Sequence, residues 1–190
     1  MIDTLFSRTD RSHLGPWQPA WDTLNGLTGD ATFVEVFAQA PALLDFVMQQ
    51  FYAKVFFGGE VEQRYKQLAR LKLSLIHGCR TCNKQNVPGA LAAGFTQSQI
   101  DALTTGSVEG FDDAERAVID YAEQIALSNM EGHVAPTLFQ RLRDHFSEAQ
   151  ILELGTAMAV ISGLAKLSFV LNLVERESYC PFVAGGDSAT

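Results

Sequence analysis

The sequence lacks an excess of positive charge, and it contains few cysteines. Its 190 residues include 14 Lys and Arg against 22 Asp and Glu, which gives a formal net charge of −8. An acidic surface repels phosphate backbones and anionic lipid headgroups, so neither a nucleic acid nor a membrane surface is an expected partner. Three cysteines are too few, and odd in number, for a disulfide framework. The composition, 47% apolar and 19% charged, is that of a globular chain.

Long hydrophobic runs are also missing. No stretch reaches the roughly 20 uninterrupted apolar residues that a membrane helix needs. The most apolar stretch, 152–174, contains Glu153 and Lys166, and it fits a buried helix or an oligomer interface better. The first residues show no basic segment followed by an apolar one, which is the pattern of a secretory signal. We therefore expect one cytoplasmic domain, in a compartment where a Cys-x-x-Cys pair is more often redox-active or metal-binding than structural.

Apolar residues recur at helical spacing through most of the chain, and no run alternates with the period of a strand. The pattern predicts an all-α fold. Residues 1–30 are expected to form an irregular arm with room for one short helix, 31–178 a helical domain, and 179–190 a C-terminal tail. Ser147 begins a capping-box pattern that opens a pair of apolar helices, from 148 to about 177. Earlier helices are expected at 31–57 (interrupted near Pro41), 61–77, 79–93, 96–103, 112–128 and 136–145.

Two of the cysteines, Cys79 and Cys82, stand three residues apart at the predicted start of the helix 79–93. Residues at this spacing share a helix face, with Cα atoms roughly 5–5.5 Å apart, a separation that a disulfide tolerates. The free N–H groups of a helix N-terminus stabilise thiolates, and Arg80 and Lys84 add positive charge nearby. The pair is therefore predicted to be a reactive dithiol.

Other interpretations of the pair stay open. The two thiols could be buried and inert. A zinc site would need further ligands, for which Cys180 and His77 or His133 are the candidates, and no second Cys-x-x-Cys exists. A thioredoxin-type domain would place the pair after a strand, and no strand is predicted.

The segment 67–94, with Gly-Cys-Arg-Thr-Cys at 78–82, resembles the core of the carboxymuconolactone decarboxylase and AhpD-like alkylhydroperoxidase superfamily. The segments 113–123 and 146–154 look like its later helices. The resemblance implies an AhpD-like helical bundle that forms trimers or hexamers and needs no cofactor. It also implies a thiol peroxidase or dithiol–disulfide oxidoreductase. Cys82 would attack a peroxide or disulfide substrate, Cys79 would resolve the intermediate, and a lipoyl-type dithiol would re-reduce the pair.

Two positions depart from the family pattern: Gln67 stands where the family has glutamate, and Asn86 where it has histidine. An amide cannot take up a proton at neutral pH, so the family's proton relay is missing at both ends. General acid–base help is worth about 10²–10⁴-fold, and we expect a weaker peroxidase. His77, two residues before Cys79, is the candidate replacement, with a structural role at a helix end as the alternative.

Two other functions remain on the sequence alone. The loss of both relay residues favours a non-catalytic, oligomeric redox sensor in which the dithiol switches slowly. A carboxymuconolactone decarboxylase-like enzyme is the other alternative, although that branch typically lacks the cysteine pair that this chain has.

Overall fold

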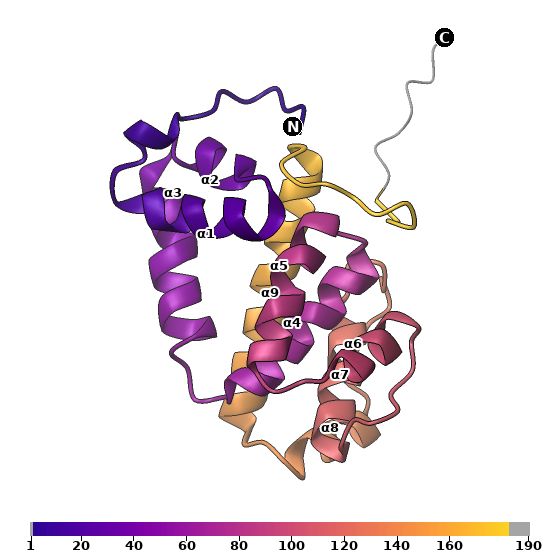
Figure 1. Ribbon diagram of the computed structural model, residues 1–190. Coiled ribbons are helices and arrows are strands. Elements are labelled where there is room, and N and C mark those ends of the chain that lie inside the picture. The colour runs from indigo at the N-terminus through magenta and orange to yellow at the C-terminus, as the bar shows by residue number, and fades with distance from the viewer. Residues whose placement is uncertain (1, 183–190) are drawn as a thin grey trace.

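The computed structural model describes residues 2–182 and consists, in that range, of helices joined by short connections (Figure 1). No strand occurs in the described part, where a single isolated bridge joins Cys79 to Arg176. The predicted all-α fold is confirmed. The elements are the 3-10 helices η1 (Arg11–His13) and η2 (Gly15–Trp17), the π-helix η3 (Phe46–Phe56), and the α-helices α1 (Gln18–Thr28), α2 (Thr32–Phe37), α3 (Pro41–Asp45), α4 (Gln63–His77), α5 (Arg80–Ala92), α6 (Gln97–Thr104), α7 (Asp113–Ile125), α8 (Pro136–Arg143) and α9 (Glu148–Val170).

Short-range signals in the sequence define several helix ends. The hydroxyl of Ser147 accepts the N–H of Gln150, whose side chain bonds back to the Ser147 backbone, so α9 begins with the predicted capping box. Thr96 and Gln99 do the same for α6. Such caps supply partners for backbone N–H groups that the helix itself leaves free.

The prediction of two apolar helices between 148 and 177 is wrong. One helix, α9, ends at Val170, because Asn172 adopts a left-handed backbone conformation with φ 52°. The N–H of Leu173 then donates to the carbonyl of Ser168 at 2.8 Å, which closes the last turn. Asparagine is a weaker sign of this conformation than glycine, so the sequence pattern did not mark the end.

The N-terminal segment is more regular than expected. Residues 18–28 form the eleven-residue α1, which has Pro19 in its first turn and Gly29 in a left-handed conformation after its last. In Figure 1, α1 lies against α5, and the two helices are in contact. The π-helical form of η3 was not predicted either. Of the expected tail, residues 183–190 lie outside the described residues.

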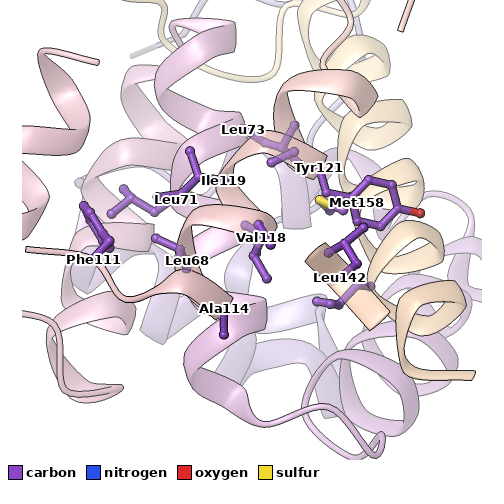
Figure 2. Close-up of a cluster of buried hydrophobic side chains, with 14 of the residues drawn as sticks. Leu68, Leu71, Leu73, Phe111, Ala114, Val118, Ile119, Tyr121, Leu142 and Met158 are labelled. Atoms are coloured by element: carbon purple, nitrogen blue, oxygen red, sulfur yellow. The ribbon is translucent and has the colours of Figure 1, made fainter. Parts of the chain in front are cut away.

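The main core lies among α4, α7, α8 and α9, and Figure 2 shows it. Leu71, Ile119, Leu142 and Met158 are almost fully buried there. Each such side chain contributes about 1.5–3 kcal/mol on burial, so this half of the molecule provides a rigid base for α4. A second apolar cluster joins α2, α3 and η3 to the segment around Leu173.

Helix α9 is long and apolar enough to cross a membrane by length and composition alone. Central helices of globular proteins pass the same test. Here α9 contacts α4, α7 and η3, and it buries Leu154 and Met158 in the main core. We therefore treat α9 as the central helix of the bundle.

Candidate active site

The turn between α4 and α5 positions the cysteine pair. Gly78 ends α4 with φ 62°, and a Cβ there would lie 2.6 Å from the Cα of Cys180, so both conformation and space require glycine. The chain then enters α5 with Cys79 at the position before its first turn. The sulfur of Cys79 accepts the N–H of Cys82 at 3.2 Å. The pair thus stands at the N-terminus of α5, as predicted.

Cys79 and Cys82 are joined by a disulfide, with Cα atoms 5.1 Å apart. This separation agrees with the value expected for residues three apart at a helix start. Cys79 is 0% exposed, whereas Cys82 is partly exposed. Of the two, Cys82 is therefore the cysteine that a molecule from solvent can reach.

A cavity of about 480 Å³ lies beside the disulfide. Residues from α1, α2, η3, α4, α5 and α9 line it, and most of them are apolar, with Phe33, Tyr52 and Phe57 supplying aromatic rings. Both disulfide sulfurs belong to residues in its wall. Concave, mainly apolar cavities of this size are typical of sites for small organic ligands.

The two amides that replace the expected glutamate and histidine occupy different places. Asn86, which is 2% exposed, lines the cavity one helical turn after Cys82. Its Nδ2 donates to the carbonyl of Arg70 at 3.3 Å, and its Oδ1 is buried without a partner. Gln67 lies outside the cavity lining, against Gly89, where a Cβ would come within 2.8 Å of Oε1. Of the two amides, Asn86 is the one placed to meet a bound molecule.

His77 also lines the cavity and is 1% exposed. Its Nε2 accepts the backbone N–H of Leu127 at 3.2 Å, so this nitrogen carries no proton. Burial lowers the pKa of His77 to about 4, which keeps the ring neutral at pH 7. These contacts favour the structural role for His77 over that of a base for Cys82.

Arg80 and Lys84 lie at the surface of α5, and each forms an ion pair with the segment that follows α9. Arg80 is 3.2 Å from Glu177, and Lys84 is 3.0 Å from Glu175. Because these partners compensate the two positive charges, the helix N-terminus is the larger stabilising influence on a thiolate at the pair. The ion pairs also fasten the segment 175–177 over the start of α5.

The third cysteine forms no disulfide, although it belongs to the same buried cluster as Cys79 and Cys82. Cys180 is buried beside Gly78, its Sγ donates to the carbonyl of His77 at 3.0 Å, and it is absent from the cavity lining. Within residues 2–182, no group of three or more His, Cys, Asp or Glu side chains is placed to hold a metal ion. The zinc interpretation therefore has no ligand set in the described part of the chain.

Sequence reasoning missed Arg70 and Ser74, which line the cavity from α4. A signal was present, because Gln67, Arg70, Ser74 and His77 follow one another at spacings of three, four and three residues. This spacing places them on one face of α4, next to an apolar face that enters the core. Polar residues along one face of a buried helix indicate that this face borders a cavity or a binding site. No comparable pattern in the sequence indicated that η3 and α1 also line the cavity.

Comparisons with known proteins point to one family. Residues 41–124 match the carboxymuconolactone decarboxylase family. The uncharacterized protein YdfG of Bacillus subtilis (strain 168) is 22% identical over 112 residues, which cover 58% of this chain and 76% of YdfG. The family resemblance seen in the sequence is thereby confirmed.

Solved structures share the fold at low sequence identity. A protein of unknown function from Agrobacterium tumefaciens, proposed to be an antioxidant defence protein AhpD, has a TM-score of 0.63 and 22% identity over 71% of this chain and 91% of its own. The debrominase Bmp8 in its apo form has a TM-score of 0.72 and 17% identity over 93% of this chain and 94% of its own. The cysteine-to-alanine variant of Bmp8 in complex with 2,3,4-tribromopyrrole has a TM-score of 0.72 and 16% identity, over 93% of this chain and 93% of its own.

Proposed function

We propose that the chain is a dithiol-dependent reductase of the AhpD-like type, with organic hydroperoxides as substrates. The match of residues 41–124 to the carboxymuconolactone decarboxylase family supports this proposal. The observation that carries the proposal is the Cys79–Cys82 pair in the wall of an apolar cavity of about 480 Å³. A hydrogen peroxide molecule would leave most of that volume unfilled. An organic hydroperoxide would bury its apolar part there and gain binding free energy from burial.

The reaction would run in two steps. The thiolate of Cys82 attacks the terminal oxygen of the hydroperoxide, so that an S–O bond forms, the O–O bond breaks, and the alkoxide leaves and takes up a proton. The thiol of Cys79 then attacks the Cys82 sulfenic acid and releases water as the disulfide forms. The balance is one hydroperoxide and two thiols converted to one alcohol, one water and one disulfide.

The site would activate Cys82 and orient the hydroperoxide without a neighbouring side chain that acts as a general base. Asn86 cannot remove a proton, but its unpartnered Oδ1 can accept a hydrogen bond from the hydroperoxide O–H and orient it toward Cys82. The N-terminus of α5 would stabilise the thiolate. Since general acid–base help of about 10²–10⁴-fold is lost with the glutamate and histidine, we expect a slower peroxidase than one with the full relay.

Re-reduction requires a thiol that reaches the disulfide. Cys82 is the accessible sulfur, so a lipoyl-type dithiol would attack it and release Cys79. A reducing cytoplasm suits this cycle. Leu152 and Val170 are exposed on α9 and offer apolar surface for the assembly of a homo-oligomer.

Stopped-flow mixing of reduced protein with cumene hydroperoxide tests the proposal. We expect the loss of two thiols per chain with formation of one alcohol. Cys82→Ser should abolish the reaction, whereas Cys180→Ser is the matched control and should leave it unchanged, since Cys180 lies outside the cavity lining. Equal peroxide consumption by wild type and Cys82→Ser would refute the proposal.

Reductive dehalogenation is a second candidate, favoured by the fold match to the debrominase Bmp8, which extends over 93% of this chain. Here the Cys82 thiolate would take the bromine from an aromatic carbon, which then receives a proton. Cys79 would displace bromide from Cys82 as the disulfide forms, so two thiols and one aryl bromide yield one arene, one bromide, one proton and one disulfide. Bromide release from 2,3,4-tribromopyrrole and 2,4,6-tribromophenol, measured by ion chromatography, separates this activity from peroxide reduction.

A further inference from the structure

Arg70 is a buried cation without a counter-ion. It lies in the middle of α4, is 6% exposed, and lines the cavity together with Cys82. Among residues 2–182, no ion pair and no hydrogen bond involves its guanidinium group. An unpaired buried charge is costly, so such an arrangement calls for an explanation.

The other basic side chains of α4 show that the fold does supply partners. Lys66 is paired with Glu153 at 2.7 Å, and Lys72 with Glu123 at 2.8 Å. Arg64 is paired with Glu115 and also donates to the carbonyl of Ala93. Arg70 alone among these cations faces the cavity, and it alone has no acidic partner in the described part of the chain.

Aromatic rings hold the guanidinium group without satisfying it. Its central carbon lies 5.4 Å from the ring centroids of both Tyr52 and Phe56. Such contacts stabilise a cation, but they accept no N–H in the way that a carboxylate does. The guanidinium nitrogens of Arg70 are not among the fully buried polar atoms that lack a partner, so they keep some exposure. Because Arg70 borders the cavity, its N–H donors remain available to a bound molecule.

The remaining cavity wall adds no opposing charge. No Asp or Glu occurs among the described lining residues, and His77 is neutral at pH 7 because burial lowers its pKa to about 4. Arg70 is thus the single formal charge in the described wall of an apolar cavity, within a chain of net charge −8. In surroundings of low polarity, such a charge attracts an anion far more strongly than it would in water.

We propose that the cavity binds a small aromatic carboxylate, whose anionic group pairs with Arg70. The fork of N–H donors on a guanidinium matches a carboxylate in a two-point contact. The aromatic part would lie along Phe33 and Phe57, with its reducible substituent toward Cys82. That this molecule is the substrate rests on the proposed function; its binding at Arg70 does not.

Calorimetric titration of the oxidised protein with 4-isopropylbenzoate and with its neutral analogue 4-isopropylbenzamide tests the proposal. A charge-assisted pair in this setting should make the Kd of the acid about tenfold or more lower than that of the amide. Arg70→Gln should remove this preference, and Arg70→Lys should retain part of it. Arg141→Gln is the matched control, because Arg141 is an exposed arginine of α8 that is paired with Asp120 and lies outside the cavity lining.

Equal affinities of the acid and the amide for the wild-type protein would overturn the proposal, and this comparison does not depend on any variant folding. A preference that persists in Arg70→Gln would overturn it as well. If the wild-type protein shows the preference for the acid but fails to reduce hydroperoxides, the anion site stands and the proposed function falls.

Discussion

Replacing His77 by glutamine should flatten the pH dependence of stability between pH 7 and pH 4. Burial lowers the pKa of His77 from 6.5 to about 4 in the folded protein. Between these two values the unfolded chain binds a proton that the folded chain does not, so the free energy of unfolding falls as the pH falls. The gap of about 2.5 pH units corresponds to about 3 kcal/mol at 1.36 kcal/mol per unit.

Glutamine has a carbonyl oxygen that can accept the N–H of Leu127 but does not titrate, so His77→Gln isolates the proton from the hydrogen bond. Urea unfolding of the oxidised protein at pH 7, 6, 5 and 4.5 measures the effect. Wild type should lose about 3 kcal/mol more than the variant toward pH 4. The exposed His133→Gln is the control and should follow wild type. Parallel curves for wild type and His77→Gln would show that the ring does not stay neutral.

Four further substitutions test individual contacts of the fold, each by urea unfolding at pH 7. Gly78→Ala should lower the free energy of unfolding by at least about 1–2 kcal/mol, because the left-handed conformation and the Cys180 backbone exclude a Cβ there. Gly163→Ala in α9, where a Cβ meets nothing within 4 Å, should instead raise the free energy of unfolding by about 0.5–1 kcal/mol. Lys66→Met should lower the free energy of unfolding by about 3 kcal/mol, because Glu153 is then left without its ion-pair partner. Ser147→Ala should cost about 1 kcal/mol through loss of the α9 cap. An unchanged midpoint for any of these would contradict the contact concerned.

The parts of the fold that sequence reasoning predicted depend on short-range signals. Capping boxes at Thr96 and Ser147 and the glycine after His77 determine helix ends within a few residues, so these ends could be located without tertiary information. The end of α9 was missed because it depends on Asn172, a residue that adopts the left-handed conformation only in some contexts.

The site shows the same division. The Cys79–Cys82 pair could be recognised because its chemistry is contained in four consecutive residues. The cavity could not, because it arises where α1, η3, α4 and α9 meet, and no local pattern specifies their packing. Arg70 illustrates the difference: an arginine in a helix is normally a surface residue, and only the tertiary structure shows that it is buried without a counter-ion.

The central claim is that the cavity presents an apolar substrate to Cys82. The most direct test is the ratio of second-order rate constants for oxidation of the reduced protein by cumene hydroperoxide and by hydrogen peroxide. Wild type should favour cumene hydroperoxide. Ala165→Phe, which places a ring in the cavity wall, should lower that ratio at least about tenfold while the hydrogen peroxide rate is retained. A ratio that is the same in both proteins would contradict the account.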